Sequence, residues 1–343
     1  METQCADIQK KDIQEIVDNK LLFCHLREST VLITGATGFI GSTFIKALIA
    51  ANDRYWLNIQ IIGQIRDAEK AKRIFGELFP QITFVKDPYV KCDYIIHTVS
   101  PTTSLYFVKH PVETIRASVL STMEILEVAK EMNARIVYLS SMEQYGIPVK
   151  QTKSITEDVI GIINHMNVRS SYSESKRLCE CLCVSYAKEY NVDVRIARLA
   201  QTFGAGISND DNHMPMQFAR AVIEGKNIVL HTEGNSITNF VYITDAVTGI
   251  LTILMNGKGG EAYNVCFDRE TRSVFEVAEM VASDIAENKI RVEIQKKDDM
   301  GYAPDVSMYL NSQKLEHLGW KANVAMFEAY KRLISYLFEK TNI

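Results

Sequence analysis

The sequence contains no apolar run that approaches the roughly 20 residues needed for a membrane span. Its N-terminus carries charged residues, including Lys10, Lys11 and Asp12, where a signal peptide would need an apolar core. The 38 Lys and Arg residues are outnumbered by 42 Asp and Glu residues, and the net charge of −4 leaves no basic stripe for nucleic acid. These absences predict a cytoplasmic protein whose partners include neither membranes nor nucleic acids.

The cysteines also lack the spacing that a metal or redox site requires. Of the seven cysteines, three cluster at Cys179, Cys181 and Cys183 on a predicted helix. Residues 179 and 183 can share a helix face, but Cys181 points elsewhere, and no partner motif with metal-ligand spacing exists. We therefore expect buried structural thiols and no metal.

The most informative segment that is present reads VLITGATGFIG over residues 31–41. Residues 31–34 predict a buried strand and residues 42–50 a helix, and Gly35, Gly38 and Gly41 lie between them with G-x-x-G-x-x-G spacing. Such glycines let the backbone turn tightly and approach phosphates, which bind the free N–H groups of a helix N-terminus. The segment predicts a dinucleotide-binding loop.

A second group of residues predicts catalysis. Tyr172 and Lys176 are four residues apart and share one helix face. Upstream, a predicted strand delivers Ser140, Ser141 and Glu143 at its C-terminal end, the edge of an open α/β sheet where ligands gather. A free tyrosine has a pKa of about 10, and a nearby Lys and a positively charged nicotinamide would both favour its phenolate.

Alternating strands and helices predict an α/β fold with a doubly wound parallel sheet and right-handed crossovers. The chain is long enough, at 343 residues, to bury a full core. The predicted strands are 31–34, 59–65, 82–86, 93–98, 135–140 and 193–198, and the main helices are 42–51, 112–132 and 172–190. The short connection 87–92 predicts a loop in place of one helix.

The sequence predicts a division of the chain into three parts. Residues 1–28 form a helical extension with an apolar face that includes Ile13 and Ile16. Residues 29–199 and 237–260, as a returning strand and helix, form the dinucleotide-binding domain. Residues 200–236 and 261–343 form a smaller mixed α/β C-terminal substrate-binding cap, with strands near 262–265 and 290–294 and a final helix from Val324. The substrate is expected in the cleft between the sheet edge and this cap.

Together these motifs resemble the extended short-chain dehydrogenase/reductase family, in particular its nucleotide-sugar epimerase, dehydratase and decarboxylase branch. The resemblance runs from about residue 30 to the C-terminal helix, and its motifs are residues 34–41, 141–146, 172–176, 198–204, 239–245 and 318–320. It implies a Rossmann domain that binds NAD(P). The implied cofactor contacts are Gly35, Thr37, Gly38, Phe39, Ile40, Gly41, Arg66, Asp87, Thr98, Val99, Ser100, Tyr172 and Lys176.

The resemblance also implies hydride transfer at C4 of a nucleotide-linked sugar. Tyr172 would exchange the hydroxyl proton, Ser141 would bond the same oxygen, and Lys176 would lower the tyrosine pKa and bind the nicotinamide ribose. The transient ketone serves epimerisation, dehydration or decarboxylation. Dehydratases carry an acid where this chain has Met142, which disfavours dehydration, whereas Glu143 is retained as in the uronate decarboxylases.

The substrate contacts depart from the family pattern. Thr238 and Asn239 stand where an Arg that binds phosphate is usual, and Gln201 replaces a common Asn. The expected substrate-binding residues are Ser140, Ser141, Gln201 and Thr238, and Arg220 or Lys226 is a candidate for the pyrophosphate.

Three functions stay open. The leading hypothesis is an epimerase or decarboxylase that regenerates its own cofactor. Arg66 follows the second strand, where NAD enzymes usually have an acidic residue. Arg66 could pair with a 2′-phosphate, so NAD and NADP both stay possible, as does an NADPH-dependent 4-keto-sugar reductase. The third hypothesis is a non-catalytic protein that senses a dinucleotide. A homodimer is also expected, through helices 112–132 and 172–190, with Ile125, Val128 and Leu182 at the interface.

Overall fold

The computed structural model describes residues 8–101, 103–148, 153–297 and 305–341. A seven-stranded sheet in the order β12-β8-β5-β4-β1-β2-β3 organises the chain, and every pairing in it is parallel. Its strands are β1 (Thr30–Thr34), β2 (Gln60–Gln64), β3 (Thr83–Val85), β4 (Tyr94–His97), β5 (Arg135–Ser141), β8 (Val194–Leu199) and β12 (Ala262–Val265). The predicted doubly wound parallel sheet is confirmed.

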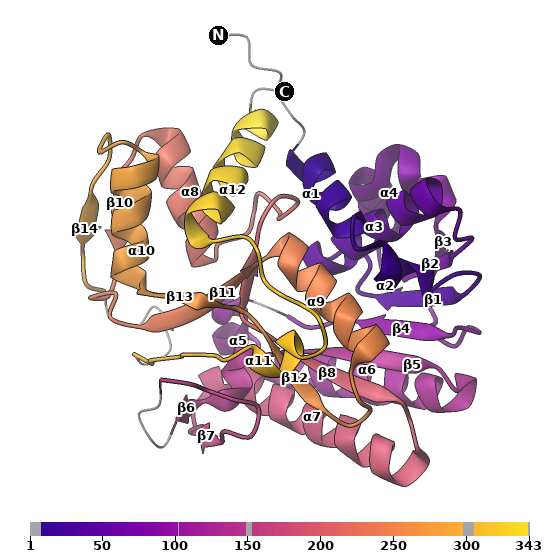
Figure 1. Cartoon of the computed structure of the whole chain (residues 1–343). Coiled ribbons are helices and arrows are strands. Elements are labelled where there is room, and N and C mark those ends of the chain that lie inside the picture. Colours follow the sequence, from indigo (N-terminus) through magenta and orange to yellow (C-terminus); the bar gives the residue numbers. More distant parts are fainter. Residues whose placement is uncertain (1–7, 102, 149–152, 298–304, 342–343) are drawn as a thin grey trace.

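Helices cover both faces of this sheet, which is why the central strand β1 has buried apolar residues at successive positions. On β1, Val31 and Ile33 join the core under α3 (Phe39–Tyr55), α4 (Ala68–Phe75) and α9 (Ile243–Asn256). Leu32 points the other way, into a smaller core under α6 (Pro111–Met132) and α7 (Ser171–Tyr190). Figure 1 shows α6 and α7 on the opposite side of the sheet from α3 and α9. The predicted loop at 87–92 is confirmed, since no helix lies between β3 and β4.

The thiols of the α7 cluster divide between the core and the surface. Cys179 and Cys183 are fully buried under the sheet, as expected, but Cys181 is exposed. The expectation of a buried thiol was wrong for Cys181 because it lies on the outer face of the helix. None of the helices in the described ranges is long and apolar enough to cross a membrane.

The cap is built on a three-stranded sheet in the order β13-β11-β9, with a two-stranded β10–β14 sheet beside it. Figure 1 shows its helices α8, α10 and α12 near these strands. The strands are β9 (Gln201–Phe203), β10 (Ile228–Leu230), β11 (Ile237–Tyr242), β13 (Phe267–Ser273) and β14 (Val292–Ile294), and the helices are α8 (Met214–Glu224), α10 (Val274–Met280), α11 (Gln313–Glu316) and α12 (Met326–Thr341). Three short elements lie near the C-terminal end of β5 and the start of α7. They are the strand pair β6 (Ile147–Pro148) and β7 (Gly161–Ile162) and the helix α5 (Ser104–Lys109).

Two strands differ from the expected division of the chain. The strand at 262–265, expected in the cap, is β12 and extends the large sheet beside β8. The strand that begins at residue 237, expected to return to the large sheet, is β11 and pairs with β9 and β13 in the cap. Only α9 returns. It makes the crossover that places β12 parallel to β8 at the sheet edge.

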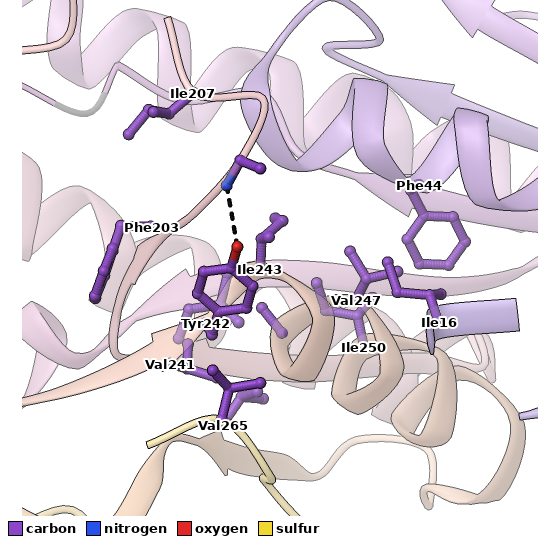
Figure 2. Packing of buried hydrophobic residues seen from close by; sticks show 14 of the residues in the cluster. Ile16, Phe44, Phe203, Ile207, Val241, Tyr242, Ile243, Val247, Ile250 and Val265 are labelled. Carbon is purple, nitrogen blue, oxygen red and sulfur yellow. Dashed lines mark hydrogen bonds between the residues drawn. The ribbon is translucent and has the colours of Figure 1, made fainter. Parts of the chain in front are cut away.

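The N-terminal extension forms two helices, α1 (Ile8–Val17) and α2 (Lys20–Cys24). The buried side chains of Ile13, Ile16 and Val17 join the main core, where α1 contacts α3, α9 and α12. Figure 2 shows Ile16 beside Phe44 of α3 and residues of α9. The extension is therefore an integral part of the core.

Candidate active site

The loop after β1 has the close backbone packing that a bound pyrophosphate requires. Gly35 has a φ of +64°, and a Cβ there would lie 2.6 Å from Thr98 Oγ1. A Cβ at Gly41 would lie 2.5 Å from the carbonyl oxygen of Gly35. Helix α3 begins at Phe39 after Gly38, without a side-chain cap or an acidic residue in its first turn. Its N–H groups are therefore directed at an anion site, and the residues present fit a dinucleotide.

The end of β4 supplies the opposite wall of this loop. Thr98 donates its N–H to Thr34 Oγ1 at 3.2 Å and its hydroxyl to the Thr34 carbonyl at 2.7 Å. Val99 Cγ2 lies 3.3 Å from the Cβ that Gly35 lacks. Ser100 Oγ lies 3.4 Å from Ser118 Oγ on α6. The structure thus places the expected segment 98–100 directly beside the glycine loop.

The two residues expected to recognise the adenosine are at the neighbouring strand ends. Arg66 is exposed just after β2, which is linked to the glycine loop by the Ala36 N–H donating to Gln64 O at 3.2 Å. Asp87 is exposed after β3, and its carboxylate accepts the Tyr89 N–H at 2.9 Å. Both side chains are available at the same sheet edge, where NAD and NADP remain equally possible.

The residues expected to be catalytic come together between β5 and α7. The Ser141 hydroxyl of β5 interacts with the Tyr172 phenol of α7 and, taken by itself, lowers the pKa of that phenol. Lys176 Nζ donates to the Leu139 carbonyl at 2.8 Å and lies 5.6 Å from the centroid of the Tyr172 ring. Tyr172 and Lys176 share one face of α7, as their spacing predicts. Both side chains are buried.

Burial dominates the proton affinities here. Burial and the Glu143 charge raise the pKa of Tyr172 above its usual value, while Ser141 and Arg169 act in the opposite direction. Burial lowers the pKa of Lys176 to about 8, since an ammonium is costly to bury. Tyr172 is therefore a neutral phenol in this state, and added positive charge beside it favours the phenolate.

An arginine that sequence reasoning missed holds Glu143 in place. Arg169 donates from its two terminal nitrogens to the two Glu143 oxygens, at 3.0 and 3.1 Å. Ser173 Oγ adds a hydrogen bond to Glu143 at 3.2 Å, and Arg169 also reaches Ser104 Oγ on α5 at 3.3 Å. Arg169 precedes Tyr172 by three residues, and this spacing from a proposed catalytic residue was a signal that could have identified it.

Phe107 on α5 was also missed. Its ring is fully buried and stacks on Tyr172 with centroids 4.3 Å apart and planes 5° from parallel. No sequence pattern marks it, because the contact depends on how α5 folds back over α7.

Ser140 lies away from the site, contrary to expectation. Successive strand residues point to opposite faces, so Ser140 shares the α7 face of β5 with Tyr138 while Ser141 points away from it. The Ser140 hydroxyl is buried and donates to Glu180 Oε1 at 2.5 Å. Its predicted contact with substrate is therefore not supported.

Gln201 and Thr238 approach the site from the cap. They lie on the adjacent strands β9 and β11, and both are partly exposed. Thr238 Oγ1 is 3.9 Å from Met142 Sδ, between Ser141 and Glu143 in sequence. This contact joins the cap to the C-terminal end of β5, where Ser141 lies.

The two cations considered for the pyrophosphate have other roles. The Arg220 guanidinium donates to the backbone carbonyls of Asn209 and Asp211 and so fixes the loop before α8. Lys226 lies beyond the end of α8 and pairs with Glu224 on the surface, at 2.7 Å. Neither residue supports the suggested contact.

The family description "NAD dependent epimerase/dehydratase family" matches residues 31–266. UDP-glucuronic acid decarboxylase 6 from Arabidopsis thaliana is 30% identical over 306 residues, covering 87% of this chain and 85% of that protein. UDP-glucuronic acid decarboxylase 1 from Danio rerio is 29% identical, over 89% of this chain and 72% of its own length.

The fold is shared with solved structures of similar size. A Methanothermobacter thermautotrophicus epimerase superposes with a TM-score of 0.78 at 21% identity, covering 95% of this chain and 96% of that one. Bacillus cereus UDP-glucuronic acid 4-epimerase, solved with UDP-glucuronic acid and NAD, gives 0.74 at 20% identity, with 91% and 99% covered. The chain belongs to the NAD-dependent epimerase/dehydratase family and is an enzyme of that family.

Proposed function

We propose that this enzyme oxidises C4 of a nucleotide-linked hexuronic acid and releases C6 as carbon dioxide. The observation that carries the proposal is the group formed by Ser141, Tyr172 and Lys176, with Glu143 and Arg169 directly beside it. The similarity to UDP-glucuronic acid decarboxylases over most of the chain supports UDP-glucuronic acid as the substrate.

The side chains divide the proton transfers. A nicotinamide dinucleotide held by the glycine loop and Lys176 would supply a hydride acceptor for C4 and a hydride donor for the final reduction. Tyr172 accepts the C4 hydroxyl proton, Ser141 holds that oxygen through a hydrogen bond, and the Lys176 ammonium stabilises the phenolate. Tyr172 later donates the proton back when the C4 ketone is reduced, so the protein and the cofactor end the cycle unchanged.

The ketone explains how carbon dioxide leaves. With C4 oxidised, the C6 carboxylate belongs to a β-keto acid. The C5–C6 bond breaks, its electron pair passes to C5 and the C4 oxygen as an enolate, and C5 then takes a proton. Glu143 is the carboxylate nearest this chemistry, and Met142 offers no proton for elimination of water, so dehydration is disfavoured.

Arg169 favours a substrate that carries a carboxylate. Its guanidinium binds the Glu143 carboxylate through two parallel hydrogen bonds, and a sugar carboxylate has the same geometry. The Arg169 side chain is only 13% exposed. A carboxylated sugar at this position can share or replace the Glu143 contact, whereas a neutral hexose offers no equivalent group.

The test is incubation of the purified protein with NAD and UDP-glucuronic acid, with UDP-glucose in parallel. We expect loss of carbon dioxide from UDP-glucuronic acid, seen by mass spectrometry, and no change in UDP-glucose. Conversion of UDP-glucuronic acid to its C4 epimer without loss of mass would make the enzyme an epimerase.

A second candidate is an NADPH-dependent 4-keto-sugar reductase. Arg66 at the end of β2 favours it, because a guanidinium suits a 2′-phosphate. Net consumption of NADPH by a 4-keto sugar nucleotide, with no turnover of UDP-glucuronic acid, would support this function instead.

A further inference from the structure

A buried carboxylate behind the catalytic strand end connects the elements that carry the site. Glu180 lies on α7, four residues after Lys176, and is only 7% exposed. It accepts hydrogen bonds from Ser140 Oγ of β5 at 2.5 Å and from Arg198 Nη2 of β8 at 2.7 Å. Arg198 Nε also lies 3.1 Å from Glu180 Oε1. One side chain therefore fixes α7 to two adjacent strands.

The network extends from Arg198 to the edge of the sheet. Arg198 Nη1 donates to Tyr145 Oη at 2.8 Å and to the Glu157 carbonyl at 2.7 Å. The Tyr145 hydroxyl donates to Asn264 Oδ1 of β12 at 2.8 Å. None of these side chains is among the buried, unpartnered polar groups of the described residues. Fully satisfied buried networks are rigid, so this one fixes α7 relative to the sheet.

Glu180 follows Lys176 by four residues on α7, so the two buried side chains are neighbours on one helix face and the carboxylate charge favours the Lys176 ammonium. The α7 groups that act on this ammonium are Cys179, Glu180 and Cys183, and Glu180 is their one carboxylate in the described part of the chain. Burial keeps the Cys183 thiol protonated, since it raises the pKa of that group well above its usual value.

The side chains that lie beside Lys176 from the neighbouring strands β4 and β5, His97 and Tyr138, are uncharged. His97 of β4 is neutral, because burial lowers its pKa to about 3. The Tyr138 ring of β5 lies 5.0 Å from Lys176 Nζ, and Tyr172 is a neutral phenol in this state. Among the α7 groups that favour the ammonium, which are Cys179, Glu180 and Cys183, Glu180 is the carboxylate, and its charge is the one that the proposal concerns.

We propose that Glu180 is a positioning residue with two effects on the reaction. Through Ser140 and Arg198 it holds α7 against β5 so that the Tyr172 phenol meets the Ser141 hydroxyl. Through its charge it keeps Lys176 protonated while Tyr172 transfers its proton. The inference rests on the proposed function only in that turnover is its most direct measurement.

Glu180→Gln tests the charge, since the amide retains the size of the side chain and one acceptor oxygen. We expect kcat to fall about tenfold or more with KM changed less than about threefold, because proton transfer and not binding is affected. Loss of the carboxylate destabilises the ammonium, so the alkaline limb of the kcat profile moves to lower pH by about one unit. An alkaline limb at the wild-type pH would overturn the electrostatic part of the proposal.

Two further variants separate charge from position. Glu180→Asp keeps the charge but shortens the side chain, so kcat should fall while the alkaline limb stays in place. Full kcat in Glu180→Asp would overturn the positioning part, and this variant stands in if Glu180→Gln does not fold. Glu189→Gln removes an exposed carboxylate from the same helix and should leave the profile as in the wild type.

A measurement without turnover keeps this inference distinct from the proposed function. Titration of Lys176 by NMR in the NAD complex, in lysine-labelled wild type and Glu180→Gln, gives the ammonium pKa directly. A lower pKa in the variant supports the inference even where UDP-glucuronic acid is not turned over. Equal pKa values overturn it whatever the substrate proves to be.

Discussion

Tyr172 is held between opposing influences, and each comes from a different element. Burial under Phe107 of α5 and the Glu143 charge favour the neutral phenol, whereas Ser141 and Arg169 favour the phenolate. The α7 helix alone therefore does not make this tyrosine a base. A positive charge beside it would favour the phenolate, so we expect proton transfer by Tyr172 to depend on an occupied cofactor site.

Tyr172→Phe isolates the hydroxyl group. The ring can keep its stack on Phe107, so the fold and cofactor binding should be unchanged. Turnover should fall by about 10²–10⁴-fold, the usual contribution of a positioned proton-transfer group. Steady-state kinetics and NAD titration measure both properties. More than about a tenth of wild-type activity would remove Tyr172 from the mechanism.

Glu143→Gln tests the step after C4 oxidation. If Glu143 acts at C5 or C6, the variant should still oxidise C4 and then stall, so reduced cofactor accumulates and is visible in the nicotinamide absorbance. Ser173→Ala is the matched control, because it removes one hydrogen bond from Glu143 and keeps the carboxylate. Full activity in Glu143→Gln would make the residue structural.

Arg66→Ala decides between the cofactors. A guanidinium binds a phosphate dianion through paired hydrogen bonds that NAD cannot offer. If Arg66 binds a 2′-phosphate, the variant should weaken NADP by about 1.5–3 kcal/mol, roughly ten- to hundredfold, with little effect on NAD. Arg73→Ala on the nearby helix α4 is a control for lost surface charge. Equal losses for both cofactors would indicate that Arg66 only stacks on the adenine.

At the scale of elements, helix α1 is attached by a buried carboxylate. Asp12 is 1% exposed, accepts a hydrogen bond from Tyr242 Oη at 2.7 Å and pairs with Arg332 Nη1 of α12 at 2.9 Å. The Tyr242 hydroxyl also accepts the Ala205 N–H, the bond drawn in Figure 2. Despite these partners, burial raises the pKa of Asp12 from 3.8 to about 6.

The sign of this shift predicts how Asp12→Asn behaves with pH. The folded state holds the Asp12 proton more tightly than the unfolded chain, so this stabilisation is complete below about pH 4 and is lost as the pH rises through about 6. Asp12→Asn has no such proton to release, so it does not lose this stabilisation as the pH rises. Its free energy of unfolding relative to the wild type should therefore rise by about 1–3 kcal/mol between pH 4 and pH 8.

Denaturant titrations at several pH values measure this difference. Glu15→Gln is the control, because it removes a more exposed carboxylate from the same arginine, where solvent screens the charge. A difference between Asp12→Asn and wild type that does not change with pH would contradict the raised pKa.

The elements that the sequence predicted well are those with local signals. The glycine spacing and the run of alternating strands and helices located β1, α3 and the strands through β8. The exchange of β11 and β12 between the sheets was not predictable in this way, because either strand satisfies the same local pattern. Their places are decided by which neighbouring edge each one pairs with.

The candidate site divides in the same way. Tyr172 and Lys176 lie on one helix, so their spacing alone brought them together. Phe107 required the fold of α5 over α7, which sequence separation hides, whereas Arg169 lies three residues before Tyr172 and could have been identified from that spacing. Ser140 is different, because the alternation of strand side chains could have placed it behind Ser141.

At the scale of the whole molecule, α6 and α7 present an apolar outer surface. Ile125 and Val128, expected there, are instead buried under the sheet, and Leu182 is only partly exposed. The expectation was therefore wrong for Ile125 and Val128, which lie on the inner face of α6. The apolar residues exposed on α6 are Val112, Ile115, Leu120 and Met123, and those on α7 are Leu178 and Val184.

We propose that this surface, defined by these six residues, joins two copies of the chain. Large apolar side chains that stay exposed on two packed helices are typical of an interface. Light scattering should therefore give the mass of a dimer at micromolar concentration. Leu120→Glu combined with Met123→Lys should give a monomer, because it places charges where the partner would exclude water.

The control for this prediction is Leu21→Glu, a change at a side chain that is 79% exposed on α2, outside the proposed surface. It should leave the dimer intact. Because Leu120 and Met123 are 55% and 41% exposed, their replacement should cost the single chain little stability. A folded double variant that remains dimeric would place the interface elsewhere. A wild type that is monomeric at micromolar concentration would contradict the proposed dimer. Because α7 also carries Tyr172 and Lys176, kinetics of a folded monomeric variant would then measure how far dimerisation holds that helix against β5.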